Sequence, residues 1–128
     1  TIKQNALTVA EAQLTDVDRQ ICVKAYIVGT AYKSLNNILL WPPFTSSTSI
    51  LLSDTPIVTD SQTDETIDKN SFLPVCLTDR ASIRKKLNLK DNPELWNHQV
   101  YIIGTRDYYM NVLGLKKVLE YEIVKAKE

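Results

Sequence analysis

Aromatic residues occur next to basic residues in two separate stretches of this chain. The residues are Tyr32, Lys33, Trp41 and Phe44 in the first stretch, and Arg106, Tyr108 and Tyr109 in the second. Aromatic rings can stack on flat ligands such as bases, and adjacent cations can neutralise phosphates. The same rings could stack on sugars, dock a protein, or simply plug the ends of a folded domain. These seven residues are the candidate ligand-binding set.

Groups for nucleophilic or acid–base catalysis are scarce. His98 is the only histidine, so any Ser-His-Asp or Cys-His arrangement would have to include it. Its place between a turn and the start of a strand is typical of a surface imidazole. Neither G-x-x-x-x-G-K-[ST] nor G-x-G-x-x-G occurs among the three glycines. We therefore expect no catalytic residues, no cofactor and no enzyme activity.

Metal ligands are equally sparse. The densest acidic group consists of Asp60, Asp64, Glu65 and Asp68. It lacks the order of oxygen ligands and glycine that a calcium-binding loop uses, so a solvated acidic loop is the expectation. Cys22 and Cys76 have no Cys or His near them at a zinc-ligand spacing. We expect no metal site and two structural thiols, with one disulfide between them as the alternative.

Length and composition predict one folded domain over residues 1–128. Hydrophobic residues make up 44% of the chain and charged residues 23%, which is typical of a globular protein. Fifteen bases balance fifteen acids, so the whole molecule exerts no long-range attraction on a polyanion. The charges are unevenly placed, because residues 54–79 carry six acids and one base while residues 80–128 carry ten bases and six acids.

Targeting signals are not evident in the chain. No stretch approaches the roughly 20 apolar residues of a membrane helix, and Thr1 does not open a signal peptide. From Thr1 in place of Met we expect an expressed fragment from which a targeting segment has been trimmed.

Hydrophobic periodicity and turn residues predict the elements that must position these side chains. Thr8 and Glu11 have capping-box spacing, which predicts a helix over 9–14 within a helical lead-in at 1–19. Alternation over 20–28 predicts a strand, with its odd-numbered residues from Ile21 to Ile27 on one face and Gly29 allowing a bulge. The other expected strands are 50–54, 72–77, 99–104, and 112–115 continuing at 118–124.

The connections between these strands are less regular. Residues 38–41 could be a strand end or a loop inserted in the core, and 55–71 is expected to be a long, exposed acidic loop. Asp79 is expected to cap a helix that ends at Leu87. Asn92 and Pro93 are expected to open one further turn, with Asn92 as its cap.

This element order predicts an all-β fold of the OB type. That fold is a five-stranded Greek-key barrel with a helix between its third and fourth strands, here with a short N-terminal helix added. Its ligand surface lies on strands two and three, framed by the loops that join strands one to two and four to five. Those two loops carry the seven candidate residues.

Several pieces of the chain, together spanning nearly its whole length, resemble a known family. They are TVAEA at 8–12, VKAYIVG at 23–29, ILLSD at 50–54, LPVCL at 73–77, LNLKDNP at 87–93 and GLK at 114–116. The chain resembles small extracytoplasmic or lipoprotein OB-fold domains of gut bacteria. That family more often has Gly in place of Ala25 and a small residue such as Gly near Asn97. The resemblance implies an exported nucleic-acid-binding lipoprotein of the cell envelope or periplasm, with a membrane link only through an upstream lipid anchor.

The expected function is therefore that of a non-enzymatic OB-fold binding module in an exported bacterial protein or lipoprotein. Single-stranded nucleic acid is the first expected ligand. The zero net charge argues against strong binding, because phosphate contacts dominate nucleic-acid affinity. The alternative is a module that contacts an envelope protein or a carbohydrate.

Overall fold

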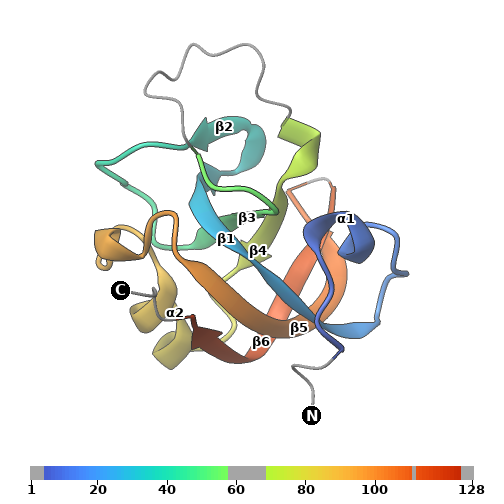
Figure 1. Cartoon of the computed structure of the whole chain (residues 1–128). Coiled ribbons are helices and arrows are strands. Elements are labelled where there is room, and N and C mark those ends of the chain that lie inside the picture. The colour runs from blue at the N-terminus through green and yellow to red at the C-terminus, as the bar shows by residue number, and fades with distance from the viewer. Residues whose placement is uncertain (1–4, 58–68, 111, 125–128) are drawn as a thin grey trace.

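The computed structural model describes residues 5–57, 69–110 and 112–124, and β-strands are the main regular structure of this part (Figure 1). Its six strands are β1 (Gln20–Tyr32), β2 (Ser34–Leu39), β3 (Ser49–Ser53), β4 (Leu73–Cys76), β5 (Gln99–Tyr109) and β6 (Val112–Ile123). The helical elements are α1 (Val9–Ala12), α2 (Ala81–Leu87) and two 3-10 turns, η2 (Lys69–Ser71) and η3 (Pro93–Leu95). The expected β-rich fold is confirmed, and α2 lies between β4 and β5.

The sheet closes into a ring. The hydrogen-bonded order is β1, β3, β4, β6 and β5, and β5 pairs again with β1, while β2 is attached to β1 outside the ring. Every pairing is antiparallel except that of β4 with β6, which is parallel and registers Val75 against Leu115. This parallel contact completes the ring.

The five-strand expectation misses β2 and underestimates the length of β1. β1 continues past Val28 to Tyr32, and its end pairs with β2, so that Ala31 faces Ile38. A register shift between Ile27 and Gly29 marks the expected bulge. A Cβ on Gly29 would run into the Leu39 carbonyl oxygen, so a glycine is needed where β2 crosses β1. Residues 38–39 are thus strand, and the chain leaves the strand at Leu40.

Two hydrophobic clusters lie on opposite faces of β1. The side chains of Ile21, Val23, Ala25 and Ile27 point into the main core inside the ring, which confirms the predicted alternation. The second group, here called the outer cluster, consists of Val28, Ala31, Leu40, Leu51 and Phe72. Tyr26, Leu35, Ile38, Trp41, Ile57 and Met110 pack against it. The outer side of β3 is consequently covered by the chain itself.

The predicted capping box at the start of α1 is confirmed. Thr8 Oγ1 accepts from the Glu11 amide at 3.1 Å, and Glu11 Oε1 accepts from the Thr8 amide at 3.0 Å. Asp54, at the end of β3, accepts from the amides of Val9 at 2.6 Å and Ala10 at 3.1 Å. These two carboxylate contacts tie α1 to the ring. The helix ends at Ala12, earlier than expected, and Leu14 is exposed.

The LNLKDNP segment closes the C-terminal end of α2 through side-chain amides. Asn88 is buried, and its Nδ2 donates to the Arg84 carbonyl at 2.7 Å and to Asp91 Oδ2 at 3.0 Å. Asn92 Nδ2 donates at 2.9 Å to the carbonyls of Lys85 and Asn88. Carbonyl groups in the last turn of a helix lack hydrogen-bond donors within the helix, and the side-chain amides of Asn88 and Asn92 donate to them.

Of the two expected caps, the one at Asp79 is wrong, whereas Asn92 stands at the predicted N-cap position of the turn that Pro93 opens, without a side-chain cap bond. The N-cap position is Arg80, without a side-chain cap, and Asp79 Oδ2 instead accepts from the Lys117 amide of β6 at 2.8 Å. Asn92 precedes Pro93 in η3 but its side chain points back to α2. In both cases the side chain bonds to a partner other than the local amide that the capping pattern assumes.

Candidate ligand-binding loops

Four of the seven candidate residues, Tyr32, Lys33, Tyr108 and Tyr109, lie at the ends of two β-hairpins. Lys33 joins β1 to β2, and Met110 follows the last residue of β5. Lys33 and Met110 have positive φ angles of 67° and 58°, in the left-handed region used by tight turns. Met110 packs against the outer cluster, to which β2 contributes Leu35 and Ile38. Both hairpins therefore pack against the outer cluster.

Three candidate side chains are exposed on these hairpins. Tyr32 is 58% exposed and Tyr108 is 64% exposed, and Lys33 is also exposed. The Lys33 Nζ lies 5.3 Å from the centroid of the Tyr32 ring, within the range of a cation–π contact. We call Tyr32, Lys33 and Tyr108 the tip residues.

Arg106 lies inside the protein instead of on a loop surface. Its side chain is 1% exposed, and its Nη1 donates to the carbonyls of Leu113 at 2.7 Å and Gly114 at 3.3 Å. Its Nε makes a longer contact of 3.5 Å with the Thr15 carbonyl. Burial lowers the pKa of Arg106 from its ordinary value, but an arginine stays protonated in a protein. The expected exposed cation is thus an internal clamp on backbone carbonyls.

Phe44 and Trp41 pack against the two hydrophobic clusters. Phe44 is buried in the main core, and its ring centroid is 6.5 Å from that of Trp96. Trp41 is half-buried against the outer cluster. These two residues therefore fit the alternative to ligand binding, in which aromatic rings fill the ends of the folded domain.

Tyr109 is half-buried beside the β3–β4 ladder. Its hydroxyl donates to the Thr48 carbonyl at 3.4 Å, and Lys116 Nζ lies 5.9 Å from the ring centroid. Burial, with a smaller contribution from the Cys76 thiol, raises the pKa of Tyr109 to about 12. The phenol is therefore neutral at physiological pH and serves as a packing group whose hydroxyl bonds to the Thr48 carbonyl.

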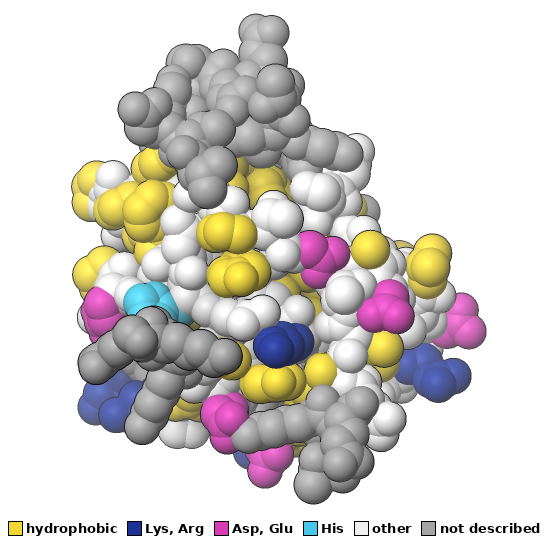
Figure 2. Space-filling view, viewed as in Figure 1, with side chains coloured by type: hydrophobic (Ala, Val, Ile, Leu, Met, Phe, Trp, Pro, Cys, Tyr) yellow, Lys and Arg dark blue, Asp and Glu magenta, His cyan; other side chains and the backbone are white. Residues whose placement is uncertain are grey.

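The outer surface of β3, where an OB-type ligand face would lie, is covered. Leu51 is fully buried there within the outer cluster, to which Phe72 also belongs, and Ile57 packs against this cluster. Sequence reasoning missed this cover, although the apolar run 38–41 was a signal for it. Among the described residues on the face in Figure 2, basic and acidic side chains are interspersed. The tip residues remain as the accessible part of the candidate set.

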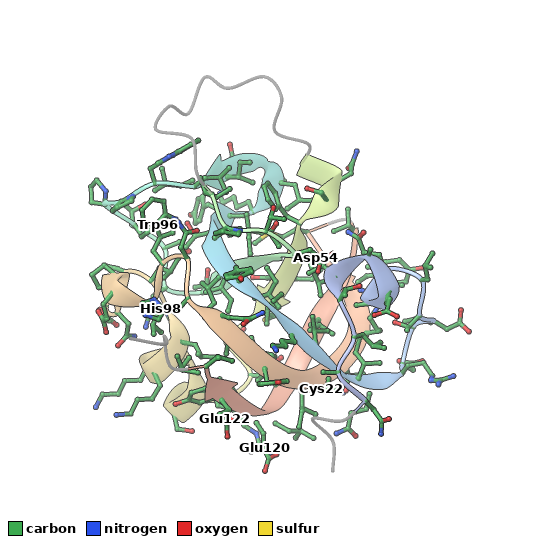
Figure 3. All side chains as sticks on the ribbon, in the orientation of Figure 1. Cys22, Asp54, Trp96, His98, Glu120 and Glu122 are labelled. Atoms are coloured by element: carbon green, nitrogen blue, oxygen red, sulfur yellow. The ribbon has the colours of Figure 1, made fainter. Side chains whose placement is uncertain are left out.

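The described residues contain no group of three or more His, Cys, Asp or Glu side chains that could hold a metal ion. In this same part of the chain, Cys22 and Cys76 are both buried and do not form a disulfide. Figure 3 shows His98 and Cys22 on separate parts of the molecule. The acidic residues Asp60, Asp64, Glu65 and Asp68 lie outside the described residues. The helices that the structure describes are too short or too polar to cross a membrane.

Asn97, near which the resembled family more often has a small residue, has a structural role that sequence reasoning did not predict. Its φ of 66° lies in the left-handed region, which explains why a glycine-like residue suits this position. Its side chain accepts from the Ile57 amide and donates to the Ile57 carbonyl, both at 2.9 Å. Asn97 therefore pins one end of the predicted 55–71 loop to the turn before β5.

Substitutions of Asn97 can separate the contribution of its side-chain hydrogen bonds from that of its positive φ angle. We expect Asn97→Gly to lower the free energy of unfolding by about 1 kcal/mol, because it loses the hydrogen bonds but keeps the backbone angle. Asn97→Ala should cost about 2 kcal/mol, since alanine also resists a positive φ. Urea unfolding of both variants measures the difference. Equal stability of Asn97→Gly and the native protein would show that the Ile57 contacts contribute nothing.

Comparison with known proteins gives one family match. No curated protein and no solved structure matches the chain. A family model described as "Domain of unknown function (DUF6359)" matches residues 7–124, from the N-terminal segment that precedes α1 to the end of β6. Because this match spans nearly the whole chain, the chain belongs to the DUF6359 family, a domain of unknown function.

Proposed function

We propose that this chain is a non-enzymatic binding module of the OB type, and that its tip residues contact the ligand. The ring order supports the OB assignment, because β1, β3, β4, β5 and β6 can be read as the five OB strands, with β2 as an addition. The position of α2 between the third and fourth of these strands supports it further.

The exposure of Tyr32 and Tyr108 is the observation that carries this proposal. More than half of each residue's surface faces solvent, on two hairpins that both pack against the outer cluster. An aromatic ring on a rigid hairpin loses little conformational freedom on binding and offers a flat apolar surface. Such rings can each contribute about 1 to 3 kcal/mol to stacking.

A glycan is the ligand that the geometry supports best. Sugar rings stack on tyrosine without needing a phosphate-binding cation, and Arg106 is unavailable because it clamps carbonyls inside the protein. Lys33 is the cation among the tip residues, and the net charge of the chain is zero. An envelope protein docking on the same tyrosines is an alternative outcome of the test.

Single-stranded nucleic acid is the second candidate, and the Lys33–Tyr32 contact favours it. A base could stack on the ring while the ammonium group meets a phosphate. Binding would be weak, because one cation releases few counterions. Anisotropy of labelled oligothymidine over a range of salt concentrations tests this candidate, and no binding at low salt would exclude it.

Removing the two exposed rings tests the proposed surface. We expect Tyr32→Ala and Tyr108→Ala each to weaken binding of a glycan identified on an array about tenfold, since each loses one stacking contact. Calorimetric titration measures the affinity. Leu119→Ala is the matched control, because Leu119 is also exposed but lies on β6 outside the tips. Equal binding by all three variants would refute the tip surface, and a ligand retained only from envelope extracts would identify a protein partner.

We also propose that this chain is located outside the cytoplasm. The family resemblance supports an extracytoplasmic domain, either periplasmic or held at the cell envelope by a lipid anchor upstream of this chain. Fractionation of the full-length gene product in its native cells tests this assignment. Recovery in the cytosol would contradict it.

A further inference from the structure

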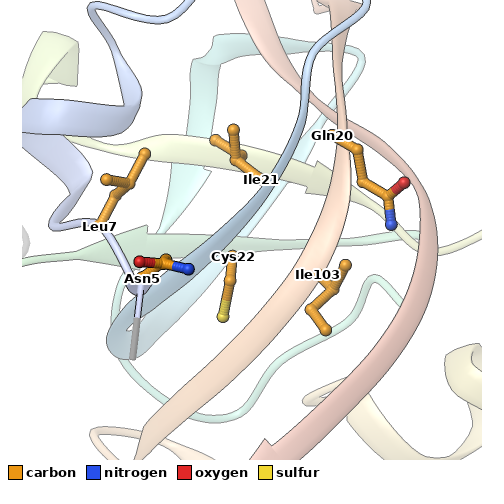
Figure 4. Close-up of a pocket in the computed structure, with 6 residues that line it drawn as sticks. All are labelled: Asn5, Leu7, Gln20, Ile21, Cys22 and Ile103. Carbon is orange, nitrogen blue, oxygen red and sulfur yellow. The ribbon is translucent and has the colours of Figure 1, made fainter. Parts of the chain in front are cut away.

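A pocket of about 390 Å³ lies beside the start of β1 (Figure 4). Its lining residues are Asn5, Leu7, Gln20, Ile21, Cys22 and Ile103. None of the six is a tip residue, so this pocket is independent of the surface proposed above. Its volume falls at the small end of the range for small-molecule sites.

The chain builds this pocket by laying its N-terminal segment along β1. The Leu7 amide donates to the Cys22 carbonyl at 2.8 Å, and the Lys24 amide donates to the Leu7 carbonyl at 2.9 Å. This parallel bridge fixes Leu7 against β1, while Ile103 of β5 is the cross-strand partner of Cys22 on the other side. Three backbone segments therefore form the walls.

The walls differ in exposure between floor and rim. Ile21, Cys22 and Ile103 are buried, whereas Asn5 and Gln20 are exposed. Ile21 belongs to the main core and Leu7 packs against it, so the floor is held by the packing of the whole domain. The pocket thus has an apolar, preformed floor and a rim of two carboxamides.

The chemistry of the lining selects the ligand. The six described residues that line the pocket are aliphatic, carboxamide or thiol, and they carry no formal charge. The partner of Ile103 on β6 is Glu120, a carboxylate that would repel an anion (Figure 3). We infer that this pocket binds an uncharged small molecule with an apolar ring or chain and a carboxamide-like polar edge. The apolar part contacts the floor, and the polar edge pairs with Asn5 and Gln20.

Benzamide and benzoate test this inference, because they differ mainly in charge. In nuclear magnetic resonance titrations of the full chain, benzamide should shift the backbone amide signals of Leu7, Cys22 and Ile103 in a saturable way. Benzoate at the same concentration should shift them less than one-fifth as far, and Glu120→Gln should narrow that difference. Shifts spread evenly over the protein, no saturable shift, or equal shifts by both probes would overturn the inference.

Ile103→Trp should abolish the benzamide shifts by filling the pocket, whereas Cys76→Ala, which changes the other buried thiol, should leave them intact.

The native protein provides a second test that does not depend on folding of the tryptophan variant. N-phenylmaleimide adds a thiol across its double bond, with the sulfur on one carbon and a proton on the other. Cys22 should react at least tenfold faster than Cys76, and benzamide should slow only Cys22. Equal rates at the two thiols would contradict an accessible pocket.

Discussion

Arg106→Ala is expected to lower the free energy of unfolding by about 3 kcal/mol, without any ligand present. The guanidinium donates to the carbonyls of Leu113 and Gly114 from a position that is 1% exposed. Hydrogen bonds from a charged donor are worth about 1.5 to 3 kcal/mol each, and removing the donor leaves the carbonyls without their partner. The deleted side chain also leaves a void where the arginine was buried.

Two further substitutions separate charge from shape at this position. Arg106→Lys should be nearly as destabilising as alanine, because a single ammonium cannot reproduce the fork that reaches Leu113, Gly114 and Thr15. Arg106→Met keeps much of the volume and removes the buried charge, so we expect a smaller loss of about 2 kcal/mol.

Denaturant unfolding of these variants measures the stability differences. Tyr108→Ala is the matched control from the same strand, and its exposed ring should change stability by no more than about 0.5 kcal/mol. Unchanged stability of Arg106→Ala would contradict the internal clamp and would return Arg106 to the list of candidate ligand contacts.

Gly114→Ala is expected to cost about 3 kcal/mol or to prevent folding. A Cβ at this position would lie 2.5 Å from the Pro74 carbonyl oxygen and 3.0 Å from Pro74 Cγ. The oxygen belongs to the backbone of β4 and cannot move without displacing the strand. The contact lies where β4 and β6 complete the ring, next to the Val75–Leu115 register. Overpacking here therefore acts on the closure of the whole sheet.

Gly104→Ala is the matched control for this prediction. Its Cβ would meet the Lys116 carbonyl oxygen at 3.1 Å, and its next contact is at 3.7 Å. A shift of a few tenths of an ångström would relieve that contact, so we expect a loss of about 1 kcal/mol. Thermal unfolding monitored by circular dichroism measures both variants. Equal midpoints for the two would show that the ring closure tolerates the extra methyl group.

The parts of the fold that could be predicted are those set by local pattern. Alternation placed the residues from Ile21 to Ile27 in the main core, because successive side chains of a strand point to opposite faces. The spacing of Thr8 and Glu11 predicted the reciprocal hydrogen bonds between them, since both partners lie within one helical turn. The location of α2 between two strands also followed from chain order.

The roles of the candidate residues could not be predicted in the same way. Tyr32 and Tyr108 are exposed, yet Phe44 and Arg106, chosen by the same reasoning, are buried. A residue type next to a turn does not reveal whether another segment covers it. That cover comes from segments far apart in the sequence, since Trp96 packs near Phe44 and the Thr15 carbonyl contacts Arg106.

The sequence by itself determined the β-rich architecture, the inward face of β1 and the capping box of α1, whose partners are three residues apart. Only the tertiary structure decided that Asp54 caps α1, that Asp79 binds β6 and that Arg106 serves the backbone instead of a ligand. The physical reason is the range of the interactions. Periodicity and capping act between neighbours in the chain, whereas burial and hydrogen-bond partnership depend on which distant segments the closed ring brings into contact.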